Sequence, residues 1–188
     1  EFEISPGPRT PRGPDLFWAA AVEWGMVDPK TVVGRRTLRL ETMQDAIAEA
    51  ERLARVESEG RLKALGNWPL GTGLHHLAVW ASYPFEGYAP EVANPPWFVK
   101  AIARVFKRRF MTKPMPAGMR IPGIEAGTMG TEETPTAQAL EQMRRAFERL
   151  GRDAPTRPNP ALGRLSHEEW KSMNLRHAEH HLGFYVEE

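Results

Sequence analysis

Apolar residues recur at helical spacing in several long segments of this 188-residue chain, and no segment alternates apolar and polar residues over a useful strand length. The segments lie within 42–60, 67–84, 97–111 and 134–151, and from 166 almost to the chain end. Apolar residues at i, i+3, i+4 and i+7 form one stripe along a helix, and that stripe must pack against another. We therefore predict an all-α protein with no sheet of more than token size.

Two of these segments begin with the spacing of a capping box. Thr42 is followed three residues later by Asp45, and Ser166 by Glu169. In such a box the hydroxyl and the acid each accept a hydrogen bond from a backbone N–H group at the start of the helix. We expect helices to begin directly after Thr42 and Ser166.

Glycine and proline mark the other boundaries. The first helix is expected to end at Gly60 or Gly66. Pro69 suits the first turn of the second helix, and Pro84 is expected to stop it, since proline lacks the N–H group that a helix interior needs. Pro135 opens the fourth segment in the same way.

The composition is that of a globular protein without cysteine. Hydrophobic residues make up 41%, charged residues 26%, and the formal net charge is +1, which argues against a protein built mainly to hold nucleic acid. Six Trp and eight Phe can fill a core. The absence of cysteine excludes disulfides, thiolate catalysis by the protein and Cys-ligated metal sites, so any metal must be held by His, Asp or Glu.

The chain divides into an N-terminal arm (1–35), rich in proline and with a short helix at 16–26, and a helical bundle (36–188) with a basic insertion (84–133). Residues 34–38 look like a twin-arginine export signal, but charged and polar residues follow where that signal needs an apolar run. The longest apolar run near the start is far shorter than the ~20 residues that span a bilayer. We expect a soluble, cytoplasmic protein, with a homodimer as one option.

Histidines gather on the last predicted helix. His177 and His181 are separated by one turn, and Trp170 and Met173 lie on the same face, so the apolar stripe of this helix carries imidazoles. Two imidazoles at i and i+4 can reach one metal ion. His180 lies at the edge of the stripe and is expected close to the site but outside the ligand set.

The second helix offers a third ligand. His76 lies at the flank of its apolar stripe, beside Trp80, whereas His75 points to the opposite face. Three histidines from two helices would leave a coordination position open for water or substrate. The alternative is that these are ordinary satisfied or surface histidines, or a short tract that chelates metal adventitiously.

The same residues resemble the DinB/YfiT-like superfamily. Trp68-Pro69-Leu70 with Leu74 and His76-Leu77-Ala78 is similar to its second helix, and the run from His177 to Gly183 is similar to its last helix. Leu162-Gly163 with the run from Ser166 to Trp170 looks more narrowly like a branch known only as a domain of unknown function.

This resemblance covers roughly residues 36–186 and implies a four-helix bundle with a three-histidine metal site. It implies a metalloenzyme of hydrolase or thiol-dependent transferase type, since some relatives use low-molecular-weight thiols. The ligands carried over from the resemblance would be His76, His177 and His181. From the ligand chemistry zinc, nickel, manganese or iron could be bound, and from the helix geometry Trp80 and His180 are expected to lie around the site. The segment 84–134 and the arm 1–35 match no motif of the superfamily.

A basic stretch with interleaved aromatic residues lies inside the insertion. Residues 92–124 contain seven Lys or Arg and no Asp or Glu. We expect one amphipathic helix over 97–111, and the following residues divide between its two faces. Phe98, Ile102 and Phe106 are expected to face the bundle, and Lys100, Lys107 and Arg108 the solvent.

Other roles for this stretch stay open. Lys100, Arg104 and Lys107 could hold an anionic substrate, or the helix at 97–113 could bind a membrane surface. Nucleic acid is not expected, because no recognised motif is present.

The function that this sequence favours is a metal-dependent enzyme acting on a small molecule of unspecified structure. The alternative is a non-catalytic bundle that uses the metal for structure, or a binding or stress-related protein. No general base is evident: Glu169 and Glu179 are close along the last helix, but solvated positions are expected for both.

Overall fold

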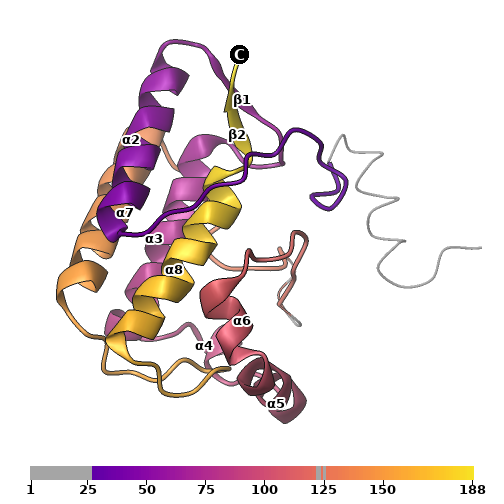
Figure 1. Cartoon of the computed structure of the whole chain (residues 1–188), viewed down its shortest axis with the longest axis vertical. Coiled ribbons are helices and arrows are strands. Elements are labelled where there is room, and N and C mark those ends of the chain that lie inside the picture. The colour runs from indigo at the N-terminus through magenta and orange to yellow at the C-terminus, as the bar shows by residue number, and fades with distance from the viewer. Residues whose placement is uncertain (1–26, 122–123, 125) are drawn as a thin grey trace, which may run out of the picture.

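The computed structural model describes residues 27–121, 124 and 126–188, and this part of the chain is helical (Figure 1). It contains seven helices and one two-stranded sheet. In chain order the elements are α2 (Met43–Ser58), β1 (Leu62–Ala64), α3 (Leu70–Glu86), α4 (Pro90–Ala93), α5 (Trp97–Val105), α6 (Lys107–Thr112), α7 (Thr136–Arg152), α8 (His167–Leu182) and β2 (Tyr185–Glu187). The predicted helical class is confirmed. The helix expected at 16–26 lies outside the described residues.

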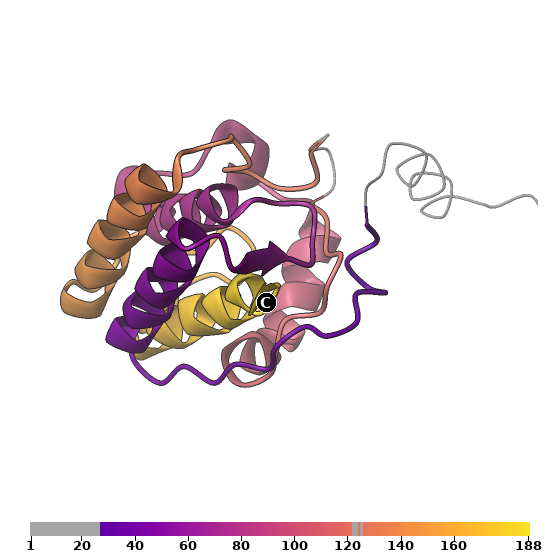
Figure 2. The same cartoon turned by 90° about the horizontal axis from the view of Figure 1, so that it is seen from above.

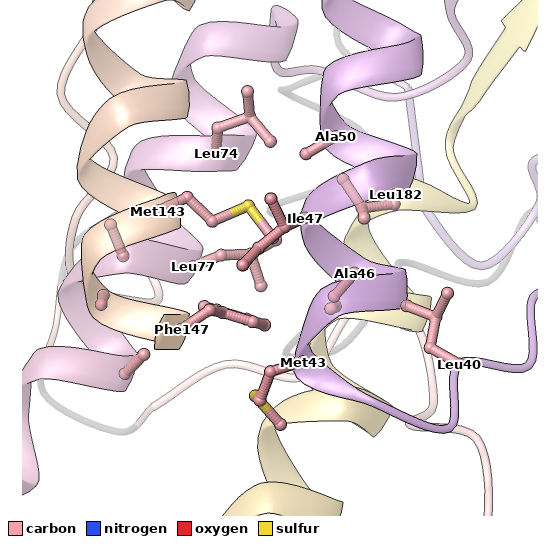
Figure 3. Close-up of a cluster of buried hydrophobic side chains, with 14 of the residues drawn as sticks. Leu40, Met43, Ala46, Ile47, Ala50, Leu74, Leu77, Met143, Phe147 and Leu182 are labelled. Atoms are coloured by element: carbon pink, nitrogen blue, oxygen red, sulfur yellow. The ribbon is translucent and has the colours of Figure 1, made fainter. Parts of the chain in front are cut away.

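Four long helices, α2, α3, α7 and α8, surround one apolar core. Helix α7 packs against α3 and α2, while α8 packs against both α2 and α3 (Figures 1 and 2). Figure 3 shows how their side chains interdigitate. The residues at its centre are Ile47 from α2, Leu77 from α3, and Met143 and Phe147 from α7.

Both predicted capping boxes are present. The Thr42 hydroxyl accepts a hydrogen bond from the Asp45 N–H group, and the Asp45 carboxylate accepts one from the Thr42 N–H group. Ser166 and Glu169 form the same reciprocal pair at the start of α8. These contacts satisfy N–H groups that have no partner within the helix.

The prediction that Pro84 stops the second helix is wrong, because α3 continues to Glu86. Pro84 lies in the last turn, where its missing N–H group removes one hydrogen bond without preventing the turn from closing. The helix ends at Gly87, whose N–H group donates to the Tyr83 carbonyl and whose φ of +118° favours glycine.

The single helix expected over 97–111 is two helices, α5 and α6, which meet at Phe106. The backbone there has φ −93° and ψ 10°, and it changes the direction of the chain. Helix α6 packs against α8, whereas α5 stands apart from the four long helices (Figure 1). One straight helix could not follow both directions.

The small sheet joins the end of the chain to the start of α3. β1 and β2 pair antiparallel, with Ala64 opposite Tyr185. The Tyr185 hydroxyl donates to the carbonyl of Pro69, the residue before α3. Strands of three residues are too short to show a period in the sequence, and neither was predicted.

In the described part of the chain, every helix is too short or too polar to cross a membrane.

Candidate metal centre

Three histidines from two helices converge at one point. The Nε2 atom of His177 lies 3.1 Å from Nε2 of His76 and 3.0 Å from Nε2 of His181. His76 comes from α3, and the other two lie one turn apart on α8. One ring nitrogen from each of the three lies within 4.8 Å of the others, so the cluster could hold a metal ion.

A hydrogen bond to the backbone fixes the tautomer of His76. Its Nδ1 atom lies 2.7 Å from the carbonyl oxygen of Met129. A carbonyl oxygen can only accept, so Nδ1 carries the hydrogen and Nε2 presents a lone pair to the cluster. Histidine ligands of metal ions are commonly oriented in this way by a group behind the ring.

The spacing of the nitrogens fits a metal ion. Two nitrogens bound at about 2.0–2.1 Å to a tetrahedral ion are about 3.3 Å apart. The two Nε2 separations, 3.0 and 3.1 Å, are close to this value. The residues present therefore fit a divalent ion with nitrogen ligands.

Burial keeps the three rings uncharged. Removal of His76 from water lowers its pKa to about 4, and the same cause holds the pKa values of His177 and His181 well below the ordinary 6.5. A neutral imidazole is the form that binds metal. The cluster therefore does not need to release protons near neutral pH before it can bind.

Two tryptophans hold the rings in place. Trp68 stacks on the ring of His181, with centroids 5.3 Å apart and planes 8° apart, and its centroid is 5.0 Å from that of His76. Trp80 meets His177 edge to face at 6.2 Å. Trp80 was predicted to lie beside the site, whereas the contacts of Trp68 with the histidine rings were not predicted.

The cluster opens into a cavity of about 420 Å³. Histidines 76, 177 and 181 lie in its wall with polar groups such as Asn67 and Asn174. Among the described residues, no carboxylate lines it. The remaining wall is mainly aromatic and aliphatic, and includes Trp68, Trp80, Phe110, Met115, Met119, Leu162, Met173 and Phe184.

Comparison with known proteins assigns the chain to a family. Residues 33–188, most of the chain, match the model of a family described as "Protein of unknown function (DUF1569)". The chain belongs to the DUF1569 family. No curated protein and no solved structure matches it.

In this DUF1569 protein, His180 lies next to the cluster and has partners of its own. Its Nδ1 atom is 3.1 Å from both the Arg35 guanidinium and the Met115 carbonyl oxygen. The Arg35 guanidinium also donates to the His180 carbonyl at 2.7 Å. His180 lines the cavity but does not belong to the group of three.

The two glutamates near the site both have structural contacts. Glu169 caps α8 and forms an ion pair with Lys107 at 2.8 Å. Glu179 is buried, and the expectation of a solvated position for it is wrong. Its carboxylate accepts hydrogen bonds from the Leu40 N–H group and the Arg176 guanidinium, each at 2.6 Å.

Two predictions about the basic helix are also wrong. Phe98, Ile102 and Phe106 are exposed rather than packed on the bundle, because α5 turns the small side chain of Ala103 inward instead. Lys100 is half-buried, with its ammonium group 2.7 Å from the Asn94 side-chain oxygen.

The sequence also left open that Lys100, Arg104 and Lys107 contact an anionic substrate. Lys107 is also half-buried in its ion pair, although solvent was expected to surround it. None of Lys100, Arg104 and Lys107 lines the cavity. The structure therefore does not bring them together with the histidines.

Residue 129 had no recognisable signal in the sequence, because it acts through its backbone carbonyl. Gly130, which follows it, has φ +69°. A Cβ atom at this position would lie 3.0 Å from the Val79 side chain of α3. Glycine thus lets the loop approach α3 closely enough for the Met129 carbonyl to reach His76.

Proposed function

We propose that this DUF1569 protein is a metal-dependent enzyme of the DinB/YfiT-like type, with His76, His177 and His181 as the ligands. The packing of α2, α3, α7 and α8 around one core supports a four-helix bundle of that type. The observation that carries the proposal is the convergence of three neutral imidazoles beside a cavity. Within the described residues, no fourth His, Asp or Glu joins the group, so a coordination position is left for a small molecule.

The nitrogen-only ligand set favours particular ions. Imidazole suits zinc, nickel and iron, and manganese is also compatible, whereas magnesium and calcium prefer oxygen ligands. When bound, a divalent ion supplies a Lewis acid that makes a water or thiol molecule in the cavity a better nucleophile. The chain has no cysteine, so any thiol would come from a low-molecular-weight cosubstrate.

The walls of the cavity indicate what the protein itself does for the reaction. The Met129 carbonyl orients His76, and Trp68 and Trp80 hold the rings. The aromatic and aliphatic wall excludes water and favours a largely apolar substrate, while Arg120 adds one cationic side chain to the lining. We propose a hydrolase or a thiol-dependent transferase, since both need a nucleophile activated in such a pocket.

Titration of the metal-free protein with cobalt(II) tests the ligand set, because the visible absorption of cobalt reports the number and type of ligands. The His177→Ala variant should lose most binding. The matched control is His75→Ala, because His75 contacts Gln142 and Glu132 and lies outside the cluster. An equal loss of cobalt binding in both variants would mean that the ligand on α3 is on the face of His75 and not on that of His76. Full cobalt binding by His177→Ala would mean that the site does not exist.

A second measurement separates catalysis from a structural metal. A small thiol is added to the cobalt-loaded protein. An enzyme with an open position should show a change in the cobalt spectrum as the thiol binds. An unchanged spectrum would favour the alternative, a non-catalytic bundle with a closed site.

A further inference from the structure

Helix α5 presents an apolar face to the solvent. Trp97 is 79% exposed, Val105 78%, Ile102 58%, Phe106 52% and Phe98 49%. At 100° per residue the four that lie within α5 occupy one continuous arc of about 140°, and Phe106 follows directly at the end of the helix. The opposite side of the helix carries Ala103, which is buried.

Large aromatic and aliphatic side chains seldom gather on an exposed surface without a function. Single exposed apolar residues are normal, but a contiguous patch marks a binding surface. The four long helices bury their apolar residues in the core, whereas α5 leaves most of its apolar residues exposed.

Uncompensated cations border this face. Arg104 is exposed on α5, and Arg108 and Arg109 are exposed on the first turn of α6. Within the described part of the chain, the ion pairs do not include any of these three arginines. Residues 92–124 contain no acid that could neutralise them locally.

We propose that α5, with the first turn of α6, binds the surface of a membrane that carries anionic lipids. Trp and Phe side chains insert between headgroup and acyl chain, while arginines bind the lipid phosphates and carboxylates. The apolar arc fits the acyl-chain region of such a membrane, and the cations at its edge fit the anionic headgroups. The short helix rests on the surface and does not cross it.

The charge of the segment argues against a second copy of this chain as the occupant. A twofold interface through α5 would place this segment against itself, and residues 92–124 contain no Asp or Glu, so Arg104, Arg108 and Arg109 would meet no opposite charge in the same segment of the other copy. Like charges facing each other across an interface are unfavourable. An anionic lipid surface has the opposite sign and needs no such compensation.

The same segment also borders the cavity. Ala103, on the side of α5 away from the exposed face, lines its wall together with Phe110 of α6. Binding through α5 would therefore hold the cavity close to the membrane, in which apolar molecules dissolve. This surface does not depend on the proposed metal chemistry, and its test uses no metal.

Sedimentation with vesicles tests the proposal on the full chain. Vesicles of phosphatidylcholine alone are compared with vesicles that also contain phosphatidylserine. We expect binding to the anionic vesicles, at least tenfold weaker binding to the neutral ones, and weakening of the anionic binding by salt. The Trp97→Ser/Val105→Ser and Arg108→Glu/Arg109→Glu variants should each bind the anionic vesicles at least tenfold more weakly.

Two control variants test whether binding depends on the position of the substituted residue and not only on the type of substitution. Val33→Ser changes an exposed apolar residue outside the helices, and Arg145→Glu changes an exposed cation on α7. Both should bind like the unmodified protein. Circular dichroism of each variant checks that the fold is retained.

The proposal is overturned if the unmodified protein does not sediment with anionic vesicles. It is also overturned if the Trp97→Ser/Val105→Ser variant binds these vesicles as tightly as the unmodified protein. Light scattering identifies the competing occupant. If the unmodified protein does not bind vesicles but forms a dimer, and if the Trp97→Ser/Val105→Ser variant is a monomer, then the exposed face of α5 binds a second copy of the chain. Equal binding to both vesicle types would also contradict the role of the arginines.

Discussion

The Nδ1 atom of His76 lies 2.7 Å from the carbonyl oxygen of Met129, so a loop between α6 and α7 determines which nitrogen of a helix residue faces the cluster. The loop and the helix are 53 residues apart in the sequence. Their contact depends on the close approach of Gly130 to Val79. The geometry of the three histidines is thus supported from outside the helices that carry them.

Substitution of Gly130 should weaken metal binding without removing a ligand. In Gly130→Ala, the new Cβ atom would press on Val79 at a backbone with φ +69°, and the Met129 carbonyl would move away from His76. Loss of such an orienting contact lowers metal affinity by about 10- to 100-fold. Competition with a chromophoric chelator measures the change.

The control for this variant is Gly60→Ala. Gly60 has a similar φ of +71° but no atom within 4 Å of the position of a Cβ atom, and it lies at the end of α2. The Gly60→Ala variant should be less stable, because alanine strains a backbone with positive φ, but its metal affinity should not change. An unchanged affinity in Gly130→Ala would show that the Met129 contact is not needed.

The metal-free protein should lose stability as the pH falls. The pKa of His76 is about 4 in the folded protein and 6.5 when unfolded, so below pH 6.5 the unfolded chain gains a proton that the folded chain does not. The free energy of unfolding should therefore fall by about 2 kcal/mol from His76 alone between about pH 7.5 and pH 5. Urea unfolding at the two pH values measures it.

His76→Gln provides the comparison, since it removes this titration. Its free energy of unfolding should depend less steeply on pH over the same interval. Parallel curves for the two proteins would show that His76 is not held neutral by the fold.

The buried pair of Arg176 and Glu179 should be needed for folding and not for chemistry. Their charged groups are 2.6 Å apart, and both side chains are buried where α8 meets Leu40. Glu179→Ala would leave the arginine charge buried without a partner, which costs about 3–5 kcal/mol. Replacing both residues, in Arg176→Met/Glu179→Leu, should cost less.

Unfolding experiments in denaturant measure these differences. The exposed pair of Arg145 and Glu141 on α7 is the reference, and Glu141→Ala should cost less than about 1 kcal/mol. A loss from Glu179→Ala as small as this would mean that water reaches the pair.

Two helical glycines should respond to alanine in opposite directions. A Cβ atom at Gly71 would lie 1.9 Å from the Thr134 carbonyl oxygen, so Gly71→Ala must push the start of α3 away from the chain before α7. We expect a loss of about 2 kcal/mol or more. At Gly151 the nearest atom, in Met43, is 3.5 Å away, and alanine should gain up to about 1 kcal/mol from its helix propensity.

Thermal unfolding followed by circular dichroism compares these two variants. A stable Gly71→Ala variant would contradict the close contact between Gly71 and Thr134.

The sequence predicts well those features that require particular residue types at a fixed spacing along the chain. The capping boxes of Thr42 and Ser166 were evident, because they require particular residue types three positions apart. His177 and His181 were recognised by their one-turn separation, and the helical spacing within 134–151 corresponds to α7.

The features that it does not predict depend on the tertiary arrangement. The Met129 carbonyl carries no residue signature, because any residue has one. Arg176 and Glu179 have the spacing of an ordinary surface pair, and only the approach of Leu40 makes them internal. An amphipathic pattern shows that α5 has an apolar face, but it does not say whether another part of the chain covers that face.

The hydrogen bond from Tyr185 to Pro69 has a consequence for the choice of ion. It ties the residues after α8 to the residue just before α3, next to the paired strands β1 and β2. The two helices that carry the histidines are therefore held against sliding along each other before any ion arrives. In the proposed metal site, discrimination between ions would then depend on ionic radius, because an ion that prefers longer bonds would have to force the helices apart or bind fewer of the three nitrogens.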